Sequence, residues 1–253
     1  MFLTAPAQPS RSAVRSSAPS RRRADIDGLR TLAVALVVVY HVWFGRVSGG
    51  VDVFLLISAY FLTDSLLRRL ESARGARLGS FWAGRFARLL PAAAVTILGT
   101  LGFAALALPL SMWPGVWDEG WASLLYVENW QLAASAVDYY ARDETLPSLF
   151  QHFWSLSIQG QVFVLWPLLL AGLAVFVRRA GVRPRPAAAA LFGVVFLASL
   201  AYSIATTASQ QEFAYFDTGA RLWEFALGSL VAIAAPHVRI GRAWSAVLGV
   251  LGL

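Results

Sequence analysis

The stretch Leu29–His41, LRTLAVALVVVYH, decides the fold class of this chain. It is an apolar run with a cation, Arg30, at its second residue and a titratable group, His41, at its end. At about 100° and 1.5 Å per residue, eleven residues make about three helical turns, so a helix places both side chains on one face roughly 16 Å apart. Ionisable groups inside a membrane helix usually mark a functional path. The structural alternative is a histidine that a neighbouring helix satisfies.

The composition is that of a membrane protein. Of 253 residues, 58% are hydrophobic and 14% are charged, which is far more apolar than an average soluble domain. The absence of cysteine excludes disulfide scaffolds, thiolate catalysis and cysteine-ligated zinc, and the three histidines have no paired spacing, so we expect no metal site. All 21 basic residues are arginines that lie mainly between apolar runs. This placement indicates membrane topology and argues against nucleic acid as a partner.

We expect an all-α fold, a polytopic transmembrane helical bundle with about seven spans. The spans are predicted near residues 29–44, 51–67, 89–110, 153–177, 187–208 and 220–235, with a seventh from about residue 244. The last apolar run has no basic flank, which predicts an incomplete C-terminus. Residues 1–23 are rich in Ser, Pro and Arg and predict a disordered basic cytoplasmic tail, ahead of a membrane domain over residues 24–253.

Charge alternates between the loops. Residues 68–88 and 178–186 are basic, whereas residues 111–151 hold six acids and a single arginine. The positive-inside rule therefore predicts a multi-pass protein of the cell membrane with a cytoplasmic N-terminus. Residues 111–151 are expected at the outer face, with a short interfacial or re-entrant helix around Trp121–Leu132.

Two acids are expected to support the first helix. Asp27 and Arg30 form an i,i+3 pair that can orient the guanidinium group. Asp52 opens the second span, and we expect it to approach His41 across the Gly49-Gly50 turn. The alternative for Asp52 is an interfacial charge at a helix N-terminus.

Two further pairs have the same three-residue spacing. Arg85 and Arg88 share one face at the cytoplasmic edge of the third span and suit polyphosphate by forked hydrogen bonds, although ordinary anchoring at the membrane surface is the alternative. Arg221 and Glu224 fall within the sixth span and are expected to pair there, for structure or for catalysis.

Several blocks, in order from Asp25 to the end, resemble the acyltransferase 3 family of polytopic bacterial enzymes that O-acylate surface glycans. The blocks are Asp25–Arg30 with Tyr40-His41, Gly50–Ser58, Phe81–Pro91, Asn129-Trp130, His152–Ser157 with Trp166-Pro167, and Tyr215–Glu224 with Leu227-Gly228. The chain departs from the family where Val-Glu-Glu-Gln-Phe-Tyr is common. Here Ile158–Phe163 reads IQGQVF, which keeps Gln161 and loses both carboxylates, and Ser58-Ala59 replaces the family's Ser-Gly.

The resemblance implies an acyltransferase with acyl-CoA, foremost acetyl-CoA, as co-substrate and no bound cofactor. The acceptor would be a carbohydrate or lipid-linked glycan of the cell envelope, and the partner surface is the lipid bilayer. Arg30, Arg85 and Arg88 would hold the phosphates, with His41 as base or acyl carrier beside Asp52. Five residues are expected to support substrate or structure: Asp27, Ser155, Gln161, Arg221 and Glu224.

Two other functions stay open at this point. The lost carboxylates and the abrupt end fit a non-catalytic or truncated relative. A transporter would also place Arg, Asp and His inside helices, although the two halves show no inverted repeat.

Overall fold

The computed structural model describes residues 24–44, 49–71, 78–139 and 148–237, apart from the side chains of residues 24–27, 41 and 137–139. Within these residues every regular element is a helix. The elements are α1 (Ala24–Val39), the π-helical η1 (Tyr40–Phe44), α2 (Gly50–Glu71), α3 (Leu78–Ala107), η2 (Leu110–Met112), α4 (Trp113–Leu124), α5 (Glu128–Tyr139), α6 (Phe153–Ala180), α7 (Pro184–Ser209), α8 (Gln211–Phe216), α9 (Thr218–Ala234) and η3 (Ala235–His237).

Four of the described helices, α2, α3, α6 and α7, are long and apolar enough to cross a membrane. Residues Gly28–Phe44 of α1 and η1 form a shorter apolar helix, and α9 has 17 residues. The all-helical fold is therefore confirmed. The seventh predicted span, from about residue 244, lies outside the described residues.

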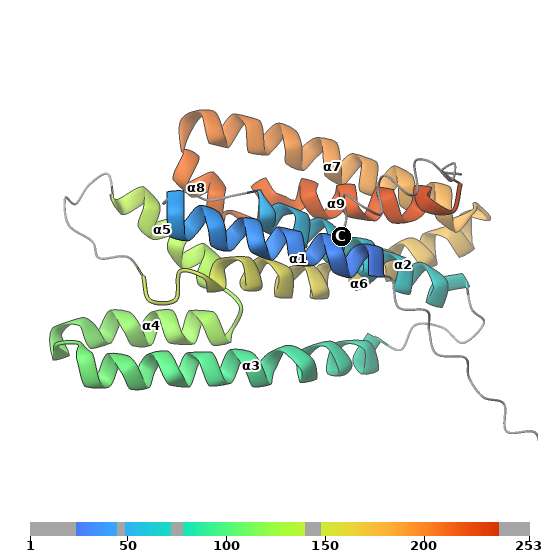
Figure 1. The fold of residues 1–253 in the computed structure, drawn as a ribbon. Coiled ribbons are helices and arrows are strands. Elements are labelled where there is room, and N and C mark those ends of the chain that lie inside the picture. The colour runs from blue at the N-terminus through green and yellow to red at the C-terminus, as the bar shows by residue number, and fades with distance from the viewer. Residues whose placement is uncertain (1–23, 45–48, 72–77, 140–147, 238–253) are drawn as a thin grey trace, which may run out of the picture.

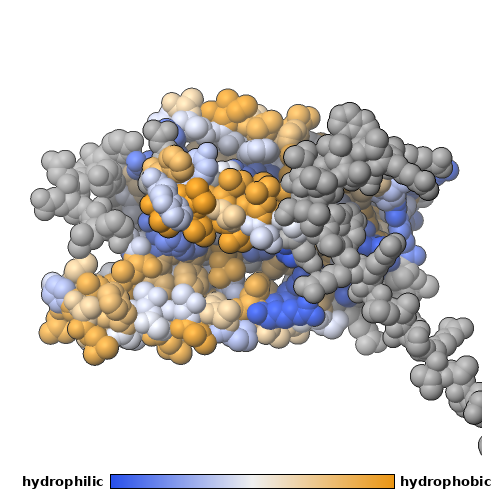
Figure 2. All heavy atoms as spheres, viewed as in Figure 1, coloured by the Kyte–Doolittle hydropathy of each residue, from blue (hydrophilic) through white to orange (hydrophobic). Residues whose placement is uncertain are grey.

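The long helices lie side by side, with α7 along one edge and the α3–α4 pair along the other (Figure 1). The arginine-bearing ends of α2 and α6 lie at the same end of the bundle as the start of α3, and we call this the basic end. Figure 2 shows apolar side chains over the visible faces of α1, α3 and α4 and hydrophilic ones gathered on α3 toward its N-terminal end. Apolar outer faces of this kind suit contact with lipid.

The core combines close packing with a few buried polar contacts. Trp166 of α6 is fully buried against Phe192 and Phe225, and its indole N–H donates to Ser229 Oγ at 2.8 Å. Ser229 Oγ also lies 2.8 Å from Thr63 Oγ1, which joins α2 to α9. A Cβ on Gly228 would lie 2.1 Å from the Leu56 carbonyl oxygen, so only glycine allows this approach of α9 to α2. Small residues and hydroxyl hydrogen bonds are the usual means of joining helices in lipid.

The acidic segment forms a hairpin of two helices, α4 and α5, instead of the single helix expected around Trp121–Leu132. The chain reverses at Tyr126, which adopts a left-handed φ of 60°. Its ring lies against α6 at Gly160, where a Cβ would come within 2.3 Å of the ring. The Val127 amide also donates to the Ala122 carbonyl at 2.8 Å. Because left-handed backbone is costly for a residue with a side chain, these contacts hold the turn in place.

The third span begins earlier than the sequence predicted. The sequence predicted a basic loop up to residue 88 and a helix from Leu89, whereas α3 already begins at Leu78. Arginine is a good helix former, so the basic stretch continues the apolar helix without a break. Arg85 and Arg88 are therefore fixed on a helix and do not lie in a loop.

Candidate active site

A cleft at the basic end gathers the arginines that the sequence singled out. It has a volume of about 510 Å³ and is bounded by α1, α2, α3 and α6. Its lining includes Arg30, Arg68, Arg85 and Arg88. Arg68 forms an ion pair with Asp64, the acid that also lines the cleft. The sequence prediction that Arg30, Arg85 and Arg88 act together is matched by their position around one space.

Aromatic rings hold these guanidinium groups in place. The Arg30 Cζ lies 5.7 Å from the centroid of the Phe61 ring. The Arg85 Cζ lies 5.4 Å from the Phe81 ring and 5.6 Å from the Phe163 ring. Such contacts stabilise a cation through the ring face and leave its N–H groups free to donate. The cleft can therefore bind an anion with several phosphate oxygens.

A second cavity of about 360 Å³ continues the cleft between α1, α2 and α6. The two spaces share Arg30, Ser58 and Gln159. Beyond them the lining is mainly apolar and includes Val37, Val38 and Val51. Ser155, one of the predicted supporting residues, also lines this cavity. The cavity thus runs from Arg30 toward the chain segments that carry His41 and Asp52.

The shared section of the two cavities, which we call the waist, contains a hydrogen bond between helices. Gln159 Nε2 of α6 donates to Ser58 Oγ of α2 at 2.6 Å. Gln159 is one of the two positions where the family motif carries glutamate. The waist is therefore polar but uncharged where Ser58 and Gln159 line it.

His41 lies in the π-helical turn η1, which continues α1. A π-helix turns the chain by less per residue than an α-helix does, so the ideal three-turn spacing from Arg30 holds only as far as Val39. The side chains of His41 and Asp27 lie outside the described residues. Their predicted roles therefore stay predictions. Short π-helical segments occur frequently at functional sites.

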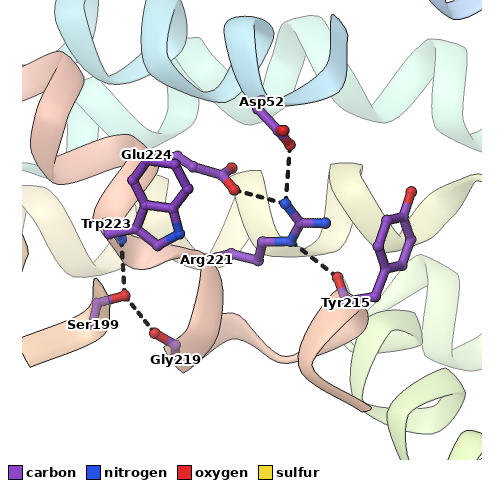
Figure 3. Close-up of polar contacts among 7 residues, drawn as sticks. All are labelled: Asp52, Ser199, Tyr215, Gly219, Arg221, Trp223 and Glu224. Carbon is purple, nitrogen blue, oxygen red and sulfur yellow. Dashed lines mark hydrogen bonds and ion pairs between the residues drawn. The ribbon is translucent and has the colours of Figure 1, made fainter. Parts of the chain in front are cut away.

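The predicted pair of Arg221 and Glu224 is part of a larger charge cluster at the opposite end (Figure 3). The Arg221 Nη1 group donates to Glu224 Oε1 at 2.7 Å and to Asp52 Oδ1 at 3.0 Å. Its Nε donates to the Tyr215 carbonyl at 3.1 Å. Asp52 therefore pairs with an arginine 169 positions further along the chain.

This cluster is enclosed. The Arg221 side chain is 14% exposed and Glu224 1% exposed, whereas Asp52 keeps 40%. The guanidinium also lies 4.8 Å from the Tyr215 ring centroid and 5.3 Å from that of Trp154. Upstream, Asp217 caps α9 by accepting from the Ala220 amide at 2.9 Å, which fixes the turn that presents Arg221. Asp52 is the one carboxylate of the cluster with an accessible side.

Ser199 fixes the same helix start from the neighbouring α7. Its hydroxyl donates to the Gly219 carbonyl at 2.6 Å and accepts from the Trp223 amide at 2.8 Å (Figure 3). Gly219 and Trp223 are four residues apart in α9, so the hydroxyl bridges a carbonyl and an amide that an α-helix pairs directly. The position of Arg221 is thus determined from two sides.

Gln161 lies away from both cavities and anchors the α4–α5 hairpin. Its Nε2 donates to the Tyr126 carbonyl and to Asn129 Oδ1, each at 2.8 Å. Its Oε1 accepts from Thr218 Oγ1 at 2.6 Å. The Asn129 Nδ2 group completes the network by donating to Thr218 Oγ1 at 2.9 Å. This geometry gives Gln161 a structural role in joining α6, the hairpin and the start of α9.

The hairpin also contains a buried acid that sequence reasoning passed over. Glu128 has no exposed surface, and its Oε1 lies 3.5 Å from Ser148 Oγ. Its Oε2 is buried and has no hydrogen-bond partner among the described residues. Burial and the nearby Glu119 raise the pKa of Glu128 from 4.5 to about 8. At neutral pH the side chain is therefore mainly a neutral carboxylic acid.

Comparison with known proteins agrees with the motif blocks. The family model described as "Acyltransferase domain" matches residues 23–253. The chain belongs to the acyltransferase 3 family. No solved structure matches the chain.

Three curated proteins that are similar to this chain are named as O-acetyltransferases. Peptidoglycan O-acetyltransferase OatA of Listeria monocytogenes is 30% identical over 235 residues, which cover 90% of this chain and 37% of the relative. A putative O-acetyltransferase of Staphylococcus aureus is 32% identical over 223 residues, which cover 85% of this chain and 35% of the relative. The putative peptidoglycan O-acetyltransferase YrhL of Bacillus subtilis is 30% identical over 219 residues, which cover 85% of this chain and 34% of the relative. The chain thus spans little more than a third of the length of these relatives.

The sequence carried no signal for the pairing of Asp52 with Arg221. A single sequence shows which groups are ionisable but not which distant helices meet, because helix contacts depend on packing. The roles of Ser58 and Gln159 at the waist were also missed. The replacement of glutamate by Gln159 was the one visible sign that this position is chemically different.

Proposed function

We propose that this chain is the donor-binding part of a membrane O-acetyltransferase that acts on a carbohydrate of the cell envelope. The observation that carries the proposal is that the arginine cleft and the apolar cavity bordered by Val38 and Val51 share Arg30, Ser58 and Gln159 in their linings. Its polar entrance suits the phosphates of acyl-CoA, and its apolar extension suits the arm that carries the thioester. The names of the relatives favour acetyl as the acyl group and peptidoglycan as the acceptor.

The basic end faces the cytoplasm in this proposal, where acyl-CoA is present. The α-helical part from Arg30 to Val39 rises roughly 14 Å, and η1 continues the chain to His41, a length comparable to that of an extended phosphopantetheine arm. The phosphates would lie against Arg85 and Arg88, and the thioester would reach the outer end of α1. The acceptor would approach that end from the opposite side of the membrane.

His41 is the proposed reactive group, as base or acyl carrier. As a base, its imidazole takes the proton of the acceptor hydroxyl, whose oxygen then attacks the thioester carbonyl. The carbon–sulfur bond breaks, and the leaving thiolate takes the proton back from the imidazolium. As a carrier, the imidazole nitrogen attacks the thioester carbonyl and displaces the thiolate of coenzyme A. The acceptor hydroxyl oxygen then attacks the acyl-imidazole, the carbon–nitrogen bond breaks, and the hydroxyl proton passes to the thiolate. Asp52, held by Arg221, would stabilise the positive charge on the ring.

The direct test is transfer of labelled acetyl from acetyl-CoA to envelope glycan in membranes that contain the full-length gene product. Replacing His41 with Ala should lower transfer at least a hundredfold, because general acid–base catalysis contributes about 10²–10⁴-fold. Asp118→Asn, a change at an exposed position of the acidic segment outside both cavities, is the matched control and should retain transfer. Undiminished transfer by the His41→Ala protein would overturn the assignment of His41.

A further inference from the structure

We propose that Ser58 and Gln159 recognise a secondary amide in the arm of the acyl donor as it passes the waist of the cleft. This inference rests on the proposed function, since it concerns the same donor site. It goes further by assigning a part of the donor to two residues for which the sequence predicted no role. It also restricts the donor class to acyl groups carried on pantetheine.

The waist is a place that a bound donor has to pass. Ser58, Gln159 and Arg30 line both the 510 Å³ cleft and the 360 Å³ cavity. A ligand with its phosphates at Arg85 and Arg88 and its acyl group in the second cavity therefore lies against Ser58 and Gln159. The two residues come from different helices, α2 and α6, and the 2.6 Å hydrogen bond between them fixes their relative position.

The bond leaves at least one donor and one acceptor on each of the two residues. It uses one hydrogen of the Gln159 amide and a lone pair of the Ser58 oxygen. Among the groups that remain are the Ser58 hydroxyl hydrogen and the Gln159 carbonyl oxygen. A secondary amide offers the matching pair, since its carbonyl accepts and its N–H donates. If the Gln159 amide were turned by 180°, a donor on Gln159 and an acceptor on Ser58 would remain, so the match is the same.

The apolar surroundings increase the free energy gained when the amide finds partners at the waist. Beyond the waist the lining includes Val34, Phe54 and Leu55, which offer no side-chain hydrogen bonds. Moving an amide from water into such a space without partners costs free energy for every hydrogen bond that the amide fails to make. The pantetheine arm carries two secondary amides, and the waist supplies partners for one of them. An acyl phosphate has no amide and would leave the Ser58 and Gln159 groups without partners.

The test compares the affinities of two ligands for the purified full chain in lipid nanodiscs, measured by calorimetry. Coenzyme A carries the phosphates and the pantetheine arm, whereas adenosine 3′,5′-bisphosphate carries phosphates without the arm. In the Gln159→Leu and Ser58→Ala proteins we expect roughly tenfold weaker binding of coenzyme A and unchanged binding of the bisphosphate. Gln210→Leu, the same change at an exposed position, is the matched control. The Arg88→Ala protein should weaken binding of both ligands.

The outcomes separate this inference from the proposed function. If the ratio of the two affinities stays the same in the Gln159→Leu and Ser58→Ala proteins, the waist does not recognise the amide, while the donor site at the arginines stands. Equal weakening of both ligands would show a structural effect and would also overturn the inference. If the unaltered protein binds neither ligand, the acyl-CoA site itself is wrong.

Discussion

The two ends of the bundle use arginine in different ways. At the basic end, Arg85 and Arg88 line an open cleft, and no ion pair joins them to a carboxylate among the described residues. At the other end, Arg221 is enclosed by Glu224, Asp52 and two aromatic rings. The open group can bind an anion from outside the protein, whereas the enclosed group already has its anions. In the proposed function, the same residue type therefore serves ligand binding at one end and structure at the other.

The largest effect is expected from breaking the enclosed group. Arg221→Met leaves Glu224 buried without its cation, and removing one partner of a buried ion pair costs about 3–5 kcal/mol. The free energy of unfolding should fall by that order, which thermal unfolding of the purified protein in detergent will show. The Arg221→Met/Glu224→Met double variant should recover most of the loss, because no buried charge remains unpaired. Single and double variants of equal stability would contradict the role of this cluster.

The corresponding change at the open end should affect ligand binding and not stability. Arg88→Ala removes a phosphate contact, and a hydrogen bond to a charged group contributes about 1.5–3 kcal/mol, so the KM for acetyl-CoA should rise at least about tenfold. The thermal unfolding midpoint should stay within about 2 °C, because Arg88 is exposed. Arg178→Ala, at an exposed position on the same end, is the control and should leave the KM unchanged. An unchanged KM in Arg88→Ala would remove the distinction between the two ends.

The smallest effect is expected from the second buried acid, Glu128. Glu224 forms an ion pair with an arginine, whereas Glu128 has no such pair among the described residues. Because burial and Glu119 raise the pKa of Glu128 from 4.5 to about 8, the folded state favours its protonated form. The stability that this proton contributes is complete below pH 4.5 and is lost as the pH rises toward 8. Thermal midpoints from pH 5 to 9 should therefore fall in the unaltered protein relative to Glu128→Gln, by a few degrees. Glu212→Gln, a change at an exposed position, is the control and should follow the unaltered protein. If the midpoints of the unaltered and Glu128→Gln proteins changed in parallel with pH, Glu128 would not titrate in this range.

Much of the fold follows from hydrophobicity and charge. The predicted spans near 29–44, 51–67, 153–177 and 187–208 match α1 with η1, α2, α6 and α7 to within a few residues, because long apolar runs have one stable conformation in lipid. The hairpin was harder to predict, since its break at Tyr126 depends on the room that Gly160 leaves on another helix. Local propensity contains no information about such a contact.

The candidate site was predictable in its residue types and in the local pair of Arg221 with Glu224, but not in the pairings between distant helices. The spacing of Arg85 and Arg88 placed them on one face, and the structure adds that Arg30 borders the same space. The contacts of Asp52 with Arg221 and of Ser58 with Gln159 join residues more than 100 positions apart. These contacts depend on how α2, α6 and α9 pack, which a single sequence does not specify.

The central claim is that the cleft at the basic end binds the acyl donor. A cryo-electron microscopy structure of the full-length protein with coenzyme A tests it most directly. The account predicts phosphate density in contact with Arg85 and Arg88 and the pantetheine arm between Ser58 and Gln159, with the thiol directed toward the outer end of α1. Coenzyme A bound at another place, or an arm that leaves the cleft without passing the waist, would contradict it.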